Sequence, residues 1–252
     1  MNALITLPGF FREHNKAAVA FSGGVDSAYL LYAAIHCCAA VKAYYVKSAF
    51  QPQFELDDAL KIANILKVDL QVLPVDVFAE PRVTQNPVDR CYHCKKIIFS
   101  EIAKAANVDG FSLLLDGTNA SDDASDRPGM RALRELSVRS PLRECGLTKP
   151  EIRRLSKEAG LFTWDKPAYA CLATRIPTGT EITAERLAKT EAAENYLCSL
   201  GFVDFRVRMF GDAAKIQVTA RQLGLAIQHR ENITAELRRH YSAVLLDLEV
   251  RA

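Results

Sequence analysis

The sequence predicts an α/β fold, in which a parallel sheet is covered by helices on both faces and a smaller C-terminal α/β domain follows. Short apolar runs alternate with helical patterns along the first half of the chain, as in parallel sheets whose strands are joined by helices. A glycine-containing string lies directly after the first apolar run and directly before a helical pattern. Near the C-terminus, apolar and polar residues alternate one by one, which predicts half-buried strands.

The first half supplies the elements of the parallel sheet. The expected strands are Ala17–Phe21, Val41–Val46, Leu70–Val75 and Phe111–Leu115, and the expected helices are Ala28–Cys38, Glu55–Leu66 and Tyr92–Ala106. We interpret the charged stretch from Asn119 to Arg139 as a functional loop that leads into a short helix. Lys149–Gly160 is expected to be a further helix, closed by its glycine.

A second domain is expected from residue 177 onward, so we predict domains of residues 1–176 and 177–252. Ala184–Leu200 has the pattern of a charged helix and is followed by Gly201. The alternating stretches Val203–Phe210 and Ala214–Thr219, a helix over Arg221–His240 and a last strand over Ala243–Val250 complete this domain. The alternation places Arg206 and Arg208 on one polar face of their strand.

Composition limits the classes of function. The 252 residues are 49% hydrophobic and 25% charged, as in ordinary globular proteins. We see no signal-peptide core and expect a cytoplasmic protein without a membrane span. A net charge of +2 with no basic run argues against a nucleic-acid partner. Seven cysteines, an odd number at irregular spacing, favour metal binding or sulfur chemistry over a disulfide framework.

The strongest signal is the string Ser22, Gly23, Gly24, Val25, Asp26 and Ser27. Its glycines allow a tight turn, so amides at the start of the next helix can face an anion. The serine hydroxyls add donors, and Asp26 could hold Mg²⁺ or orient phosphates. A glycine turn with a serine cap is the alternative. The Gly-Lys-Ser/Thr ending of a Walker loop is missing.

A second loop follows the expected strand that ends at Leu115. Loops at the carboxyl ends of parallel strands line the ligand crevice, and carboxylates suit Mg²⁺ whereas arginine suits phosphate. The alternative is a solvated acidic turn. The candidates are Asp116, Gly117, Asn119, Asp122 and Arg127, with Asp123, Asp126 and Arg131 nearby.

Three cysteines are candidate metal ligands. Cys91 and Cys94 form a CxxC pair, and Cys171 lies in a segment that Pro167 interrupts. This spacing fits a redox pair, part of a zinc site or part of an iron–sulfur site. Three cysteines could hold a four-iron cluster in which one iron lacks a protein ligand and binds sulfide.

Four stretches together resemble the LarE family of sulfur transferases, which belongs to the PP-loop (adenine nucleotide alpha hydrolase-like) superfamily. They are SGGVDS at Ser22, RCYHCK at Arg90, DGTNASDDASDRPGMRAL at Asp116 and KPAYACLATRIPTGTEIT at Lys166. The resemblance implies cleavage of ATP between its α- and β-phosphates. It also implies that carboxylates of pyridinium-3,5-biscarboxylic acid mononucleotide are adenylated and become thiocarboxylates, during synthesis of the nickel-pincer nucleotide.

The resemblance also implies how sulfur is delivered. In some members the cysteine matching Cys171 is a sacrificial donor that becomes dehydroalanine, and in others two further cysteines, matching Cys91 and Cys94, help to hold a [4Fe-4S] cluster. With all three present, this chain is placed in the cluster-dependent branch. The implied cofactors are ATP, Mg²⁺ and the cluster. The expected partners are a small nucleotide substrate, sulfide or a sulfur-donor protein, and further copies of the chain.

The chain departs from the family pattern in its C-terminal strands. Phe210 stands where the family usually has histidine, and Gln217 stands where it has glutamate, so the role of Gln217 is open. Arg206 or Arg208 is expected to bind the substrate phosphate. Glu194 is a weaker candidate for a substrate or metal contact, and we interpret it as part of a solvated helix face. The rival functions are a tRNA thiolase, an ammonia-using ligase and a nonenzymatic metal- or nucleotide-binding module.

Overall fold

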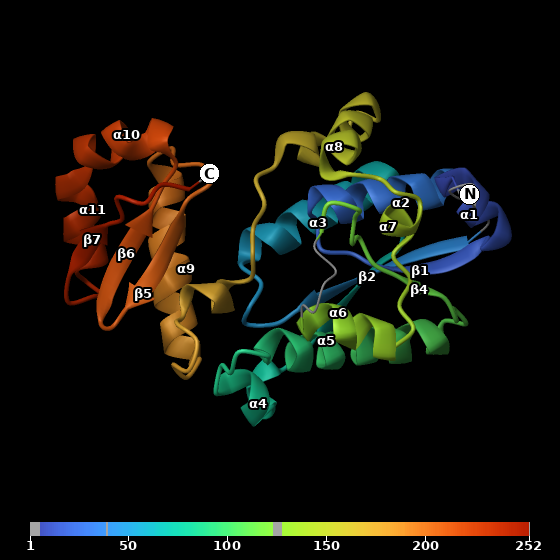
Figure 1. Cartoon of the computed structure of the whole chain (residues 1–252), viewed down its shortest axis with the longest axis horizontal. Helices are drawn as coiled ribbons and strands as arrows, with labels where there is room; N and C mark the ends of the chain where they lie inside the picture. The colour runs from blue at the N-terminus through green and yellow to red at the C-terminus, as the bar shows by residue number, and fades with distance from the viewer. Residues whose placement is uncertain (1–5, 39, 123–127, 252) are drawn as a thin grey trace. The chain divides into compact units, whose positions relative to one another are not determined.

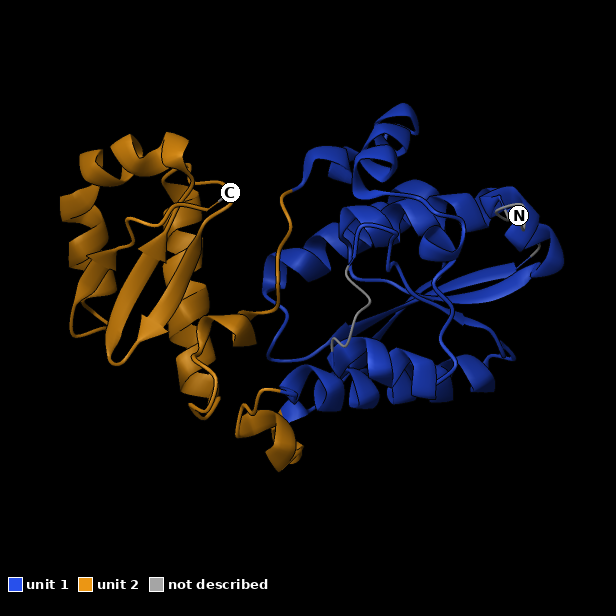
Figure 2. Ribbon diagram, in the orientation of Figure 1, with its two compact units in different colours: residues 1–77, 89–166 blue, residues 78–88, 167–252 orange. Residues whose placement is uncertain are grey.

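The computed structural model describes residues 6–38, 40–122 and 128–251. Its residues group into two compact units (Figure 2): unit 1 contains residues 1–77 and 89–166, and unit 2 contains residues 78–88 and 167–252. These units are sets of residues in mutual contact. The division into domains of residues 1–176 and 177–252 stays a prediction.

Unit 1 contains the predicted parallel sheet. Its strands are β1 (Lys16–Ala20), β2 (Ala40–Lys47), β3 (Leu70–Pro74) and β4 (Leu114–Leu115), in the order β3-β2-β1-β4 with every pair parallel. β4 is shorter than predicted because the Phe111 amide donates to the Ala106 carbonyl at 2.8 Å. This bond commits Phe111 to the end of the preceding helix and not to the sheet.

Helices cover both faces of this sheet (Figure 1). Because side chains of a strand alternate between faces, Ala17 and Val19 pack in one core cluster and Ala18 in the other. The first cluster includes residues of α1 (Leu7–Glu13), α2 (Val25–Cys37), α3 (Gln53–Leu66), α7 (Pro141–Glu144) and α8 (Lys149–Glu158). The second includes residues of α5 (Arg90–Val108) and α6 (Pro128–Glu135). The predicted two-sided α/β layering is therefore confirmed.

Unit 2 contains a three-stranded sheet. It consists of β5 (Arg206–Phe210), β6 (Ala213–Gln217) and β7 (Val244–Leu246), in which β5 and β6 are antiparallel and β6 and β7 parallel. Its helices are α4 (Pro81–Thr84), α9 (Ala184–Ser199), α10 (Leu223–Gln228) and α11 (Arg230–Leu237). β5 begins later than predicted because Asp204 has a left-handed backbone, φ 51°. The predicted single helix over 221–240 is wrong, since the chain leaves α-helix at His229, between α10 and α11.

Two smaller findings concern the apolar helices. Cys37, at the end of α2, is exposed, so it is not part of the core although its helix is largely apolar. Across the described ranges 6–38, 40–122 and 128–251, no helix has the length and apolar character needed to cross a membrane.

Candidate active site

The glycine string forms a tight turn from the end of β1 into α2. Gly23 has φ +74°, and a Cβ at this position would lie 3.1 Å from the Glu55 carbonyl oxygen, so a larger residue would be strained and crowded. The Ser27 hydroxyl accepts a hydrogen bond from the Ser22 amide at 3.3 Å and donates to the Gly24 carbonyl at 3.2 Å. Because Gly24 caps α2 without a side chain, the first-turn amides are arranged to meet an anion.

The second predicted loop packs directly on this turn. A Cβ on Gly117 would lie 2.9 Å from the Ser27 amide nitrogen and 3.1 Å from its Cα, so only glycine permits this approach of the two backbones. β4 lies beside β1 in the sheet, which explains why the loops after these strands meet. The loops Ser22–Ser27 and Asp116–Asn119 are far apart in the sequence but pack against each other.

Asp26 pairs with a lysine that our sequence analysis missed. Lys149 Nζ, at the start of α8, lies 2.5 Å from Asp26 Oδ2. The other oxygen, Oδ1, is buried and has no hydrogen-bond partner among the described residues. Burial raises the pKa of Asp26 above its usual 3.8, and the hydrogen bond from Lys149 opposes this shift. A further cation would therefore stabilise the ionised carboxylate.

Lys166 brings a second ammonium group to the same turn. Its Nζ donates to Asp58 Oδ2 at 2.6 Å and reaches the Gly23 carbonyl at 3.5 Å. Arg153 supports this position by donating to the Trp164 carbonyl at 2.6 Å and to the Lys166 carbonyl at 2.8 Å. Two lysines from the end of unit 1 therefore lie at the glycine turn, each held by a carboxylate.

The polar residues of the second loop mainly hold the loop itself. Buried Asp116 accepts hydrogen bonds from the Ser140 and Thr118 hydroxyls, both at 2.5 Å. Asp122 Oδ2 accepts from the Asn119 amide at 2.9 Å, and Asn119 is 2% exposed. These contacts favour a shaping role over direct ligand binding. Asp123, Asp126 and Arg127 lie outside the described residues, whereas Arg131 lies on α6, with its guanidinium 3.8 Å from the centre of the Tyr92 ring.

Cys91 and Cys94 lie in the first turns of α5. Residues three apart on a helix have neighbouring side chains, so the pair lies on one face, with Cys91 exposed and Cys94 buried. The buried Arg90 side chain donates to Cys91 Sγ at 3.7 Å. Cys171 belongs to unit 2 and is partly buried. Among the described residues, no group of three or more His, Cys, Asp or Glu side chains is placed to hold a metal ion, and the predicted cluster ligands stay a prediction.

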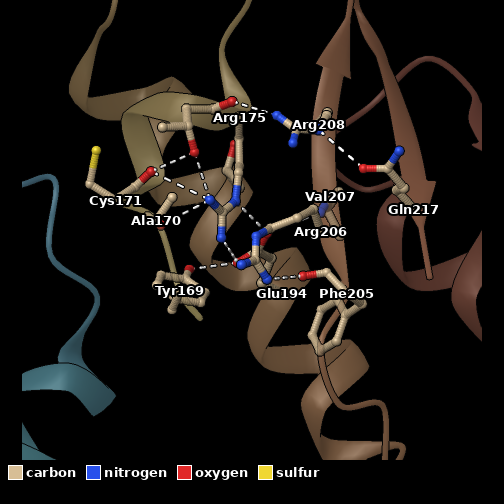
Figure 3. A network of polar contacts seen from close by, with 12 residues as sticks. Tyr169, Ala170, Cys171, Arg175, Glu194, Phe205, Arg206, Val207, Arg208 and Gln217 are labelled. Carbon is tan, nitrogen blue, oxygen red and sulfur yellow. Dashed lines mark hydrogen bonds and ion pairs between the residues drawn. The ribbon is translucent and has the colours of Figure 1, made fainter. Parts of the chain in front are cut away.

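In unit 2, a buried ion pair fixes the segment that carries Cys171 (Figure 3). Arg175 and Glu194 form two hydrogen bonds, Nε–Oε1 at 2.7 Å and Nη2–Oε2 at 3.1 Å, and Arg175 is 1% exposed. Arg175 Nη1 also donates to the Ala170 carbonyl at 2.9 Å and to the Cys171 carbonyl at 3.4 Å. Figure 3 shows the Cys171 carbonyl facing Arg175 and its sulfur pointing away from the network.

Glu194 is therefore not part of a solvated helix face, and our interpretation of this residue is wrong. It is 5% exposed. Beyond Arg175, its carboxylate accepts hydrogen bonds from the Tyr169 hydroxyl at 2.6 Å and from the Val207 amide at 3.0 Å. Four donors explain how the charge of Glu194 is tolerated inside the protein. Glu194 thus joins α9, β5 and the segment around Cys171.

The two strand arginines differ in accessibility. Arg206 is buried, donates to the Phe205 and Ala168 carbonyls, and packs 4.9 Å from the Tyr169 ring centre. Arg208 is half-buried and donates to the Thr174 carbonyl at 2.8 Å. The polar strand face that the sequence predicts is thus covered by the segment 168–175.

These arginines lie in a region with excess positive charge. Burial, followed by Arg175 and Arg251, lowers the pKa of Arg206 to about 10, and the same causes lower the pKa of Arg208. Arg208 Nε is 3.5 Å from Gln217 Oε1, a neutral partner that supplies no compensating charge. An anion bound here would stabilise both guanidinium groups.

Three features of the site were not predicted from the sequence: Lys149, Tyr169 and the pairing of Arg175 with Glu194. Lys149 stands 123 positions after Asp26, inside a helix start whose Thr148–Glu151 capping box accounts for the local pattern. Tyr169 and Arg175 stand in a quoted motif, but their partner lies on a distant helix. For Tyr169 and Arg175, the only signal in the sequence was an aromatic and a basic residue in a segment that Pro167 interrupts.

Comparison with known proteins places this architecture in a family. The family model described as queuosine biosynthesis protein QueC matches residues 16–88. An uncharacterized protein, slr1717, of Synechocystis is 37% identical over 227 residues, which cover 89% of this chain and 84% of the relative. The pyridinium-3,5-bisthiocarboxylic acid mononucleotide synthase of Lactiplantibacillus plantarum, a LarE protein, is 32% identical over 246 residues, 96% of this chain and 89% of the synthase. The chain belongs to the LarE family.

Membership of the LarE family confirms the resemblance found in the sequence, together with the PP-loop fold and the sulfurtransferase class of enzyme. The tRNA-specific 2-thiouridylase MnmA of Thermotoga petrophila is also similar, at 27% identity over 196 residues, which cover 60% of this chain and 54% of that enzyme. PP-loop sulfurtransferases therefore match the chain both along its length and over a part of it.

Proposed function

We propose that this LarE-family chain uses ATP to adenylate the carboxylates of pyridinium-3,5-biscarboxylic acid mononucleotide and converts them to thiocarboxylates. The observation that carries the proposal is the similarity, along 96% of the chain, to a synthase of the corresponding bisthiocarboxylic acid. Two features support the proposal. The amides of the turn at Ser22–Ser27 can face phosphates, and the arginines of unit 2 can bind an anionic substrate.

Adenylation requires the glycine turn to hold the pyrophosphate part of ATP. A substrate carboxylate oxygen attacks the α-phosphorus, the bond from this phosphorus to the β-bridging oxygen breaks, and pyrophosphate leaves. The first-turn amides of α2 and the Ser22 and Ser27 hydroxyls are the donors for its charge. Lys149 and Lys166 are cations close to the same turn, and we propose that both neutralise the leaving group.

Mg²⁺ fits this arrangement at Asp26. Hard cations prefer carboxylate oxygens, and Asp26 Oδ1 is a buried oxygen that lacks a hydrogen-bond partner among the described residues. Mg²⁺ held there would supply charge neutralisation to the phosphates. Asp116, Asn119 and Asp122 would shape the adjoining loop, and Gly117 would allow it to approach Ser27.

The substrate's phosphate is proposed to bind at Arg208. Its guanidinium is the more accessible of the two strand arginines and has a neutral partner, Gln217. Arg206 lies deeper and is held by backbone carbonyls, so it would raise the local positive potential and position Tyr169. Arginine suits this task because its planar donors match phosphate oxygens.

For sulfur delivery, we propose that Cys91, Cys94 and Cys171 are the ligands of a [4Fe-4S] cluster. A CxxC pair on one helix face fits two ligands of one cluster, and three protein thiolates leave one iron without a protein ligand. When bound, the cluster would supply a sulfide. That sulfur would displace AMP from the acyl-adenylate, so that a thiocarboxylate is left. Sulfide or a sulfur-donor protein would renew the supply, and assembly into a homo-oligomer stays a prediction.

Turnover of the anaerobically reconstituted protein with substrate, Mg·ATP and sulfide tests this proposal. We expect repeated formation of thiocarboxylate and AMP, with Cys171 intact in the mass of the recovered protein. Cys91→Ser, Cys94→Ser and Cys171→Ser should each lose iron. A thiol that becomes dehydroalanine loses hydrogen sulfide, about 34 Da. If the protein is lighter by this mass after one turnover, the cluster mechanism is wrong and Cys171 is a sacrificial sulfur donor.

A second candidate is tRNA thiolation, favoured by the similarity to the MnmA enzyme. The net charge of +2 offers little attraction to an RNA backbone. A tRNA mobility shift that weakens steeply with salt, together with ATP-dependent sulfur incorporation into that tRNA, would favour this candidate over the small nucleotide.

A further inference from the structure

Asn86 holds two distant segments of unit 2 together. It is 1% exposed, and its backbone is left-handed, φ 55°, a conformation that asparagine tolerates better than most residues. Its side-chain amide donates to the carbonyls of Ile176 at 3.3 Å, Pro177 at 2.8 Å and Thr180 at 3.1 Å. One side-chain amide thus meets three backbone acceptors, and since it has two N–H groups, one of these is shared between two carbonyls.

The backbone around Asn86 strengthens this link. The Gly179 amide donates to the Asn86 carbonyl at 2.8 Å, and the Ile182 amide donates to the Thr84 carbonyl at 2.7 Å. We call these two bonds and the three bonds of the side-chain amide the Asn86 clasp. The clasp links Thr84 and Asn86, in the short segment 78–88, to residues 176–182, far along the chain.

The position of the clasp in the sequence connects it with the candidate sulfur ligands. Asn86 stands five residues before Cys91, and Ile176 stands five residues after Cys171. Along the covalent chain, residues 92–170 otherwise separate these two cysteines. The link consists of hydrogen bonds inside unit 2 and of two short stretches of chain, one from Asn86 to Cys91 and one from Cys171 to Ile176.

We propose that Asn86 is a positioning residue for sulfur transfer, because its clasp ties the chain that leads into Cys91 and Cys94 to the chain that follows Cys171. The inference rests on the proposed function, in which these three thiolates bind one cluster. A short tether raises the effective concentration of one ligand toward the others. In this role Asn86 acts through the two segments that it joins.

Asn86→Gly removes the side-chain bonds of the clasp but keeps the left-handed backbone conformation. Glycine accepts a positive φ without strain, but it removes the amide from three carbonyls. One hydrogen bond changes an equilibrium by about two- to twelvefold, so we expect the clasp to open at least tenfold more often. Asn86→Asp is a second variant, which keeps the side-chain shape but sets a carboxylate against the same carbonyls. Gln85→Ala is the matched control, since Gln85 is an exposed neighbour.

The experiment measures clasp and cluster separately on the full chain. Hydrogen exchange of the Gly179 and Ile182 amides, without iron, reports clasp opening. Iron release to a ferrous chelator, after anaerobic reconstitution with ferrous iron and sulfide, reports cluster retention. ATP affinity checks that unit 1 remains folded. For Asn86→Gly and Asn86→Asp, we expect faster exchange at both amides, at least tenfold faster iron release and unchanged ATP affinity, whereas Gln85→Ala should match the wild type.

The outcomes distinguish this inference from the proposed function. Faster exchange with unchanged iron release in both Asn86 variants would overturn the positioning role and leave the cluster in place. Unchanged exchange in both variants would overturn the clasp itself. A wild-type protein that takes up no iron would overturn the cluster proposal and the role of Asn86 with it, although the altered exchange would still be measured.

Discussion

The two units present their polar residues in opposite ways. Among the described residues, no side chain caps the first turn of α2 at the glycine turn of unit 1, and the buried Oδ1 of Asp26 has no hydrogen-bond partner. In unit 2, the carboxylate of Glu194 already has four donors. This difference supports our proposals that the glycine turn of unit 1 receives a charged ligand and that Arg208 of unit 2 binds one. The ion pair of Arg175 and Glu194 holds the Cys171 segment.

The buried ion pair gives the largest expected effect. Glu194→Ala leaves Arg175 charged, buried and unpaired, which should lower the free energy of unfolding of unit 2 by about 3–5 kcal/mol. The exposed pair of Arg154 and Glu158 in unit 1 is the matched contrast, and Glu158→Ala should cost less than about 1 kcal/mol.

Hydrogen exchange of the β5 and β6 amides in increasing urea measures this change, while fluorescence of Trp164, the single tryptophan, follows unit 1. Equal losses for Glu194→Ala and Glu158→Ala would remove the contrast between buried and exposed pairs.

The strand arginines test which side chain of unit 2 meets the ligand. Charge-assisted hydrogen bonds contribute about 1.5–3 kcal/mol, so Arg208→Gln should weaken substrate binding at least tenfold and leave ATP affinity nearly unchanged. Arg206→Gln should lower the stability of unit 2 as well, because its carbonyl partners are buried with it. Calorimetric titration with substrate and with ATP measures both. Full substrate affinity in Arg208→Gln would exclude Arg208 from the site.

A single added methyl group tests whether the packing of Gly117 against Ser27 shapes the phosphate site. Gly117→Ala would place a Cβ within 3.1 Å of Ser27 backbone atoms, and such overpacking costs about 1–3 kcal/mol. The glycine turn must shift, so ATP affinity should fall by tenfold or more. Gly224→Ala is the control, since nothing lies within 4 Å of a Cβ there. Similar ATP affinity in both variants would show that the Gly117 contact does not shape the phosphate site.

The smallest expected effect concerns the protonation of Asp26. Burial raises its folded-state pKa above 3.8, so the folded protein binds this proton more tightly than the unfolded chain. Stability from this group is therefore highest at low pH and falls as pH rises from 3.8 through the raised pKa. Urea unfolding of the wild type and of Asp26→Asn should give a stability difference that declines over this range. A difference that grows with pH would mean that Lys149 outweighs burial.

The same contrast explains what the sequence revealed. The glycine turn is one uninterrupted string between a strand and a helix, so local geometry was sufficient to predict it. The partner of Asp26, by contrast, is Lys149, which depends on how α8 packs. Glu194 was misread because a charged helix pattern does not show which glutamate meets a buried arginine. The layered fold followed from periodicity, but the breaks at Asp204 and His229 depend on single backbone conformations.

The most direct test of the central claim is the identity of the ATP products. With Mg²⁺ and pyridinium-3,5-biscarboxylic acid mononucleotide, phosphorus NMR should show AMP and pyrophosphate in equal amounts, formed only when the carboxylate substrate is present. Asp26→Ala should abolish both products while the protein remains folded. ADP and phosphate as the products would contradict an adenylating reaction at the Ser22–Ser27 turn.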